Sequence, residues 1–322
     1  MHFLLTNILI IFLRFGSCAG KCAAVRNNVF QCLSVLSNKC AECTKTVLTL
    51  VPPSIRPIIE YRTVCETIYR SVKLAKFGNM KYIHITVDIG AAEKYYRVLW
   101  NNQIEFKDVI IHLGDFHAML HFFGNIGKFV TSSGFQDILF QAGMCSDGSI
   151  KKILSGKAYN SCWRVHEIFS EAINRLFEDA YCKRSLSETL MGKERNLTEN
   201  TNLILDITEF KMYINDYNSF KEKCLDGELG ATPQFWMLYQ KIMDLIHQLH
   251  FSVNVNDYFL RLVTWEELLK LSFAMSKPNY SRYGSYYTMI LRSIDTLHPG
   301  AWEEYRIEVC LYVETKMAFV NP

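Results

Sequence analysis

Two short stretches decide the fold: HITVDIGAAEKYYRVLW, residues 84–100, and VIIHLGDFHAMLHF, residues 109–122. Each begins with an apolar, β-branched run, which predicts a strand. An acidic residue follows each run, Asp88 in the first stretch and Asp115 in the second, and a helix-like pattern comes next. Strand, helix and strand in close succession form a βαβ unit, so we expect the two strands to be parallel and adjacent.

Polar residues at the predicted strand ends are the candidate site. In open parallel sheets, ligands bind at the carboxyl ends of the strands, and this rule selects Asp88, Asp115 and His117 as candidate catalytic residues. Asp88 is also the candidate metal ligand, because Mg²⁺ and Mn²⁺ prefer oxygen ligands. Two such ions would activate a water or a 3′-hydroxyl to attack a phosphodiester. Asp88 fits equally well as the N-cap of the following helix, and His117 fits as a core histidine.

Most of the remaining chain has apolar residues at helical spacing. Glycines are expected to break the apolar helices that follow Asp115. Helices are predicted over these ranges: 61–77, 89–100, 118–130, 135–143, 149–154, 162–181, 233–253, 258–275 and 280–299. The aromatic and methionine residues of the long helices are interpreted as core. The sequence therefore predicts an α/β protein with a large, mostly helical region.

The composition of the chain and its proline-rich linker suggest three parts. Of the 322 residues, 49% are hydrophobic and 21% charged, which is typical of a globular protein with a sizeable core. Residues 1–57 form a basic, cysteine-rich segment that closes with a linker containing Pro52, Pro53 and Pro57. Residues 58–190 are expected to form the α/β core, and residues 191–322 a helical region.

Two groups of residues could bind zinc. Cys18-x3-Cys22 and Cys40-x2-Cys43 offer four thiolates, although an odd total of eleven cysteines with irregular spacing also fits reduced, unligated thiols. His117 and His121 are four residues apart, as on one face of a zinc-binding helix, but the surroundings of His121 are apolar. Unligated residues are the favoured interpretation in both cases.

The N-terminal run MHFLLTNILIIFL allows more than one cellular location for the protein. It is too short to span a bilayer, so we expect no membrane span. With the small residues after it, the run is similar to a signal peptide, although no basic residue precedes its apolar part. The sequons at Asn196 and Asn279 would suit a secreted glycoprotein. The alternatives are a nuclear or cytoplasmic protein and a secreted one.

The stretch ITVDIGAAEKYYRVLW…VIIHLGDFH resembles the middle of the RNase H-like catalytic domain of eukaryotic DDE transposases, including the Mutator-like group. A wider resemblance, over about residues 61–300, is to uncharacterised transposon-derived animal proteins. Four further features of that group have counterparts here: Gly114–His117, Ile126–Gly127, Gly156–Asn160 and the segment 282–299. The resemblance implies a partial RNase H-like sheet in the α/β core.

The resemblance assigns roles to the strand-end residues. Asp88 corresponds to the second acid of the catalytic triad, His117 to a turn histidine that orients a carboxylate or nucleic acid, and Asp115 to a variable position. The first acid should end an earlier strand, but residues 1–87 contain no aspartate. The third acid is expected on a helix beyond the last one predicted here, and Glu303, Glu304 and Glu308 precede that position.

These observations predict a transposon-derived, transposase-like protein related to metal-dependent DNA cleavage and transfer, truncated and catalytically incomplete. Mg²⁺ or Mn²⁺ would be its cofactor if it is active, DNA its partner, and a homo-oligomer its working form. The alternatives are a non-enzymatic module that binds nucleic acid or protein, and a secreted glycoprotein.

Overall fold

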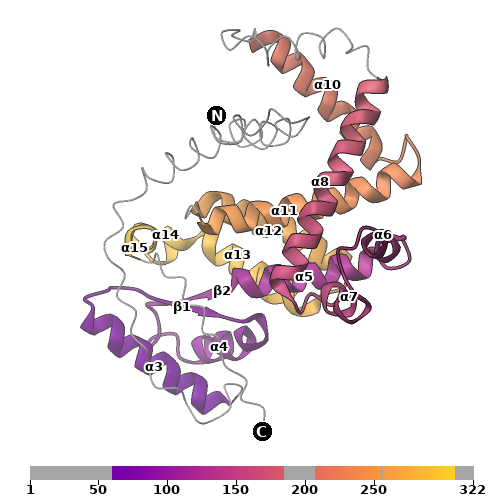
Figure 1. Cartoon of the computed structure of the whole chain (residues 1–322). Coiled ribbons are helices and arrows are strands. Elements are labelled where there is room, and N and C mark those ends of the chain that lie inside the picture. Colours follow the sequence, from indigo (N-terminus) through magenta and orange to yellow (C-terminus); the bar gives the residue numbers. More distant parts are fainter. Residues whose placement is uncertain (1–59, 185–206, 255–256, 309–322) are drawn as a thin grey trace. The chain divides into compact units, whose positions relative to one another are not determined.

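The computed structural model describes residues 60–184, 207–254 and 257–308 (Figure 1). The predicted signal-like run, the four clustered cysteines, the proline linker and the Asn196 sequon lie outside these residues. The chain divides into two compact units, Met1–Met119 with Gln248–Pro322 as unit 1, and Leu120–His247 as unit 2. Unit 1 thus combines two separated stretches of the sequence, while the three predicted domains remain a prediction.

Unit 1 contains the predicted βαβ element. Strand β1 (Ile83–Val87) is followed by helix α4 (Ile89–Asn101) and strand β2 (Val109–Leu113). The strands pair in parallel, with Ile83 opposite Val109 and Val87 opposite Leu113. The expectation of two parallel, adjacent strands is confirmed, and helix α3 (Tyr61–Phe77) precedes them as predicted.

The sequence explains why these elements form. All five residues of β2 are buried, as expected for a strand in the middle of a parallel α/β layer. Helix α4 buries one face, comprising Ala91, Ala92, Tyr95, Tyr96 and Val98. This spacing covers one stripe of a helix, so α4 packs along the sheet and keeps its polar face in solvent.

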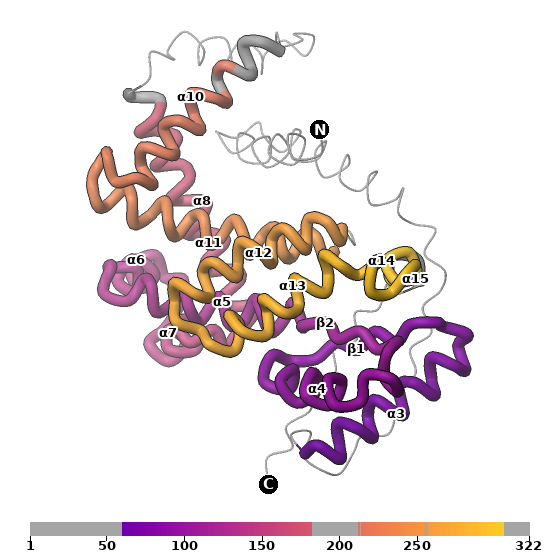
Figure 2. The backbone as a smooth tube through the Cα atoms, turned by 180° about the vertical axis from the view of Figure 1, so that it is seen from behind, coloured from indigo at the N-terminus to yellow at the C-terminus, as the bar shows by residue number. Residues whose placement is uncertain are grey.

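The C-terminal part of unit 1 is helical. Helix α12 (Tyr258–Ala274) begins at Asp257, whose carboxylate accepts a hydrogen bond of 2.9 Å from the Leu260 amide. The π-helical turn η1 (Tyr280–Gly284), α13 (Ser285–Arg292), α14 (Ile294–Leu297) and α15 (Ala301–Glu308) follow (Figure 2). Among the described residues the sheet has two strands, so the chain is mostly helical with a small α/β element.

The regular elements described in unit 2 are all helices. Its elements are the later part of α5 (Asp115–Phe129), α6 (Phe135–Gln141), α7 (Asp147–Leu154), α8 (Tyr159–Arg184), α10 (Ile207–Leu225) and the main part of α11 (Ala231–Asn254). In its core the His166 ring lies stacked between Phe123 and Phe135, with centroid distances of 5.5 and 5.2 Å. Burial lowers the pKa of His166 to about 3, so this histidine is a neutral core residue at physiological pH.

The expected break of the first apolar helix at its glycines is wrong, because α5 continues through Gly124 and Gly127. These glycines allow close contact between backbones. A Cβ on Gly127 would lie 2.0 Å from the Leu154 carbonyl oxygen, and one on Gly124 would lie 2.9 Å from that of Ser155. The turn after α7 therefore packs directly on α5, and this contact outweighs the low helix propensity of glycine.

Within the described ranges, none of the helices combines the length and the apolar character that crossing a bilayer requires.

Candidate functional site

The carboxyl ends of β1 and β2 lie side by side, as the candidate site requires. The Gly114 amide donates a 2.9 Å hydrogen bond to the Val87 carbonyl and extends the ladder by one step past the strands. Asp88 follows β1 directly, and Asp115 is the first residue of α5. The two acids thus follow neighbouring strands, but their surroundings differ.

Asp88 is exposed, with a carboxylate that does not cap the helix. It occupies the N-cap position of α4 with extended backbone angles, yet its side chain forms no capping hydrogen bond. Its backbone carbonyl accepts hydrogen bonds from the amides of Ala91 and Ala92, both at 3.0 Å. The N-cap interpretation therefore holds for the position of Asp88 but not for its side chain.

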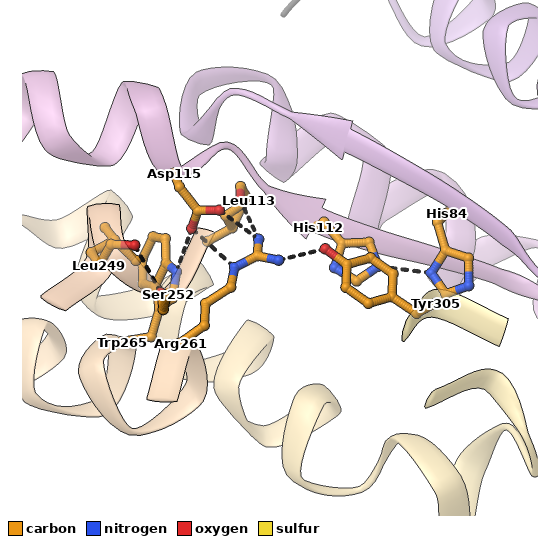
Figure 3. Close-up of polar contacts among 9 residues, drawn as sticks. All are labelled: His84, His112, Leu113, Asp115, Leu249, Ser252, Arg261, Trp265 and Tyr305. Atoms are coloured by element: carbon orange, nitrogen blue, oxygen red, sulfur yellow. Dashed lines mark hydrogen bonds and ion pairs between the residues drawn. The ribbon is translucent and has the colours of Figure 1, made fainter. Parts of the chain in front are cut away.

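Asp115 is buried and held by two donors from α12 (Figure 3). Arg261 binds it as a fork, with 2.9 Å from Nη2 to Oδ2 and 3.2 Å from Nε to Oδ1. The Trp265 indole Nε1 donates to Oδ1 at 2.8 Å. Both carboxylate oxygens are thus occupied, beside a positive charge that opposes a metal ion. The catalytic role of Asp115 remains a prediction, and these contacts favour a structural role.

Arg261 links the sheet to the end of the described chain. Besides Asp115, it contacts the Leu113 carbonyl at 3.5 Å and donates from Nη1 to the Tyr305 hydroxyl at 2.5 Å. Burial opposes its charge most strongly, but Asp115, Tyr287 and Tyr305 together outweigh burial, and the pKa of Arg261 lies well above its usual value. Arg261 is therefore a permanently charged residue inside unit 1, neutralised by one carboxylate.

A histidine pair lies next to this ion pair. His84 on β1 and His112 on β2 share a hydrogen bond of 2.9 Å between Nδ1 and Nε2, and the Tyr305 ring stacks on His112 at 4.7 Å (Figure 3). Burial lowers the pKa of His84 to about 4, with a smaller contribution from His298. Burial also lowers the pKa of His112 well below its usual value, and His84 and Arg261 lower it further. Both rings are neutral at physiological pH.

This pair predicts a loss of stability in acid. Because the pKa of His84 falls from about 6.5 in the unfolded chain to about 4 in the fold, protons bind the unfolded chain preferentially between these values. The free energy of unfolding should therefore decrease as the pH falls from 6.5 to 4. His84→Gln, which keeps a hydrogen-bonding partner for His112, should reduce this slope by up to about 1.4 kcal/mol per pH unit. Urea titrations across this range measure the slope, and the difference in slope between wild type and variant should vanish between pH 7.5 and 8.5. An unchanged acid slope in the variant would contradict the expectation.

His117 lies apart from this buried network. It is exposed in the first turn of α5, and its Cδ2 atom is 3.5 Å from the place that a Cβ on Gly114 would occupy. The core-histidine interpretation therefore does not fit His117. Its role in orienting a carboxylate or nucleic acid remains a prediction.

The sequence did not point to Arg261, Trp265, Tyr305 or the histidine pair as members of one site. A signal for Arg261 existed, since it is the one charge in the otherwise apolar run YFLRLVTW at the start of α12. Trp265, Tyr305, His84 and His112 are common core residues, and their spacing along the chain carries no such signal.

Among the described residues, groups of three or more histidine, cysteine, aspartate or glutamate side chains that could hold a metal ion are absent. The candidate zinc pair His117 and His121, which the sequence left as the less favoured interpretation, belongs to no such group within the described residues. Asp88 as a ligand of Mg²⁺ or Mn²⁺ remains a prediction.

The fold and the strand-end residues define a mostly helical protein with a small parallel α/β element. The chain belongs to the family described as Domain of unknown function (DUF8702), which matches residues 33–315. The match includes all elements of both units up to α15. No curated protein and no solved structure matched the chain.

Proposed function

We propose that this protein is transposon-derived and transposase-like, with a partial RNase H-like core related to metal-dependent DNA cleavage and transfer. Its catalytic site is incomplete, so it binds DNA in the nucleus without cutting it. The observation that carries this proposal is Asp88, an exposed carboxylate at the end of a parallel strand that does no capping. An acid at this position suits a ligand of Mg²⁺ or Mn²⁺.

We infer that the catalytic site is incomplete from the contacts of Asp115, the second strand-end acid. Two-metal phosphodiester chemistry needs several carboxylates around ions about 3.5–4 Å apart. Arg261 and Trp265 occupy the oxygens of Asp115, which cannot bind a metal without leaving a buried guanidinium unpaired. Asp88 is then the remaining strand-end acid of the described sheet, and a single carboxylate holds such ions weakly.

Two measurements on the full chain test this proposal. We expect no nicking of supercoiled plasmid in Mn²⁺ above the level of the Asp88→Asn variant. Affinity for duplex DNA should fall steeply between 50 and 200 mM salt, because phosphate contacts release counterions. Mn²⁺-dependent nicking that Asp88→Asn abolishes would show that the site is complete. A lack of affinity for DNA at low salt would contradict the proposed DNA binding and favour a module that binds protein.

A secreted glycoprotein is the second candidate, and one observation favours it. Asn279, the asparagine of the second sequon, is exposed directly before η1. Mass spectrometry of the protein from a secreting cell line tests it. Sugar on Asn279 with a mature N-terminus beyond Gly20 would establish secretion and contradict a nuclear role, whereas an unmodified Asn279 on a retained protein would remove this candidate.

A further inference from the structure

Helix α3 has the largest excess of basic residues among the described helices of unit 1. Its sequence, YRTVCETIYRSVKLAKF, contains one acid, Glu66, and four cations, Arg62, Arg70, Lys73 and Lys76. By contrast, α12 has two acids and two cations, and α15 has three acids and one arginine. The positive charge of the helices of unit 1 is therefore concentrated on α3.

The four cations share one side of the helix. At 3.6 residues per turn they fall within an arc of about 120° around the helix axis. All four are exposed, whereas the opposite side of α3 is buried where the helix packs on α4 and β1. In both views of the backbone, α3 lies at the periphery of unit 1 (Figures 1 and 2). These four residues, Arg62, Arg70, Lys73 and Lys76, are called the basic face of α3.

Most of the charge on the basic face is not neutralised by neighbouring acids. Arg70 forms an ion pair with Glu66 one turn before it, and both side chains are 44% exposed. Within the described ranges, Arg62, Lys73 and Lys76 form no ion pair with an acidic side chain. An exposed surface with three unpaired cations attracts an anionic partner.

The spacing of the cations suits an extended polyanion. From Arg62 to Lys76 the basic face is about 21 Å long, at about 1.5 Å per residue. Each strand of duplex DNA has a phosphate about every 3.4 Å, so side chains spread over this length can reach several phosphates. An anionic membrane favours a helix that exposes its apolar side, but the apolar side of α3 is buried. Its exposed apolar residues, Leu74 and Phe77, are confined to the last turn.

We propose that the basic face of α3 binds the phosphate backbone of duplex DNA. Lysine and arginine contacts to phosphates position a protein on DNA without reading its sequence, so this interface accepts duplexes of any sequence. The inference rests on the proposed DNA binding, and it assigns that binding to a surface that does not include the strand-end acids. DNA binding by α3 therefore does not require a complete catalytic site.

The salt dependence of DNA affinity in the full chain tests this interface. The dissociation constant for a short duplex of arbitrary sequence is measured between about 50 and 200 mM salt. In the double variant Lys73→Gln and Lys76→Gln, the slope of log affinity against log salt should become shallower by about 2, because each lost phosphate contact removes about 0.9. Affinity at about 100 mM salt should fall by about 10-fold or more. Glu66→Gln, which releases Arg70 from its ion pair, should raise the affinity.

The matched control removes two other exposed cations of unit 1. Lys270→Gln combined with Arg292→Gln, at side chains 71% and 66% exposed, should leave both the slope and the affinity unchanged. All substituted side chains are exposed or half-exposed, so thermal unfolding followed by circular dichroism should be the same in every variant.

The possible outcomes separate this inference from the proposed function. Wild-type affinity for DNA that the α3 double variant retains would overturn the interface and leave the proposed DNA binding intact. An equal loss in the control variant would also overturn it, since net charge alone would then explain the binding. A wild-type chain without affinity for DNA would contradict both. If the α3 variant keeps its DNA affinity but loses binding to phosphatidylserine vesicles, the basic face binds a membrane surface instead.

Discussion

Replacing Arg261 by methionine is expected to lower the free energy of unfolding by about 3–5 kcal/mol. The reason is Asp115, which is buried and would lose both hydrogen bonds of the guanidinium fork while keeping only that of Trp265. A buried carboxylate without its counter-charge pays its desolvation cost without compensation. Methionine fills a similar volume, so the loss would report the charge rather than a cavity. Chemical denaturation measures the difference.

A surface arginine supplies the matched control. Arg292 forms an ion pair with Glu266 outside the core, with its side chain 66% exposed. Arg292→Met should change stability far less than Arg261→Met, because exposed pairs are weak. Combining Arg261→Met with Asp115→Asn should restore part of the loss by removing the orphaned charge. Equal effects of the two single arginine variants would show that the Asp115 pair contributes no more than a surface contact.

Gly127→Ala is expected to destabilise the protein by about 3 kcal/mol. The added methyl group would lie 2.0 Å from the Leu154 carbonyl oxygen and 2.6 Å from the Leu154 Cα, so the backbone of α7 would have to move. Rotation of a flexible side chain cannot relieve this overlap. The free energy of unfolding from denaturant titration is the measurement.

Gly148→Ala tests whether the effect comes from the contact. Gly148 lies in α7, and a Cβ there would meet no atom within 4 Å. Alanine should leave stability unchanged or raise it by up to about 1 kcal/mol, since it favours helices over glycine. A Gly127→Ala variant as stable as Gly148→Ala would mean that α5 and the turn after α7 separate at little cost.

The βαβ element was predictable because its signals are local. The run IHITV, the helical pattern after Asp88 and the run VIIHL lie within one short stretch, and a parallel arrangement follows from their order. The ion pair at Asp115 was not predictable in this way. Its partner Arg261 is 146 positions away, and only the packing of α12 brings the two together. The pattern around Asp115 is the same whether its carboxylate binds a metal or a guanidinium.

Helix α10 shows a second limit. Its sequence, ITEFKMYINDYNSFKEKCL, was not predicted as a helix, because polar and charged residues are interspersed among its apolar ones. In the structure, Tyr217 and Cys224 join Phe177 and Tyr181 of α8 in one hydrophobic cluster. Such a helix depends on its neighbours for stability, and a single-sequence pattern cannot include them.

The contact between α5 and the turn after α7 bears on the two motif matches that contain Gly127 and Gly156. Ile126–Gly127 and Gly156–Asn160 resemble a transposon-derived group at two places that look independent in the sequence. In the fold they lie on the two sides of one helix contact. Gly127 faces the Leu154 backbone on one side. On the other side Gly156, which has a φ of +71°, lies against Leu120 and Gly124. They therefore count as one observation rather than two for the resemblance predicted from the sequence, and that observation concerns how two helices meet. A close backbone contact of this kind constrains the two glycines independently of any residue at the strand ends.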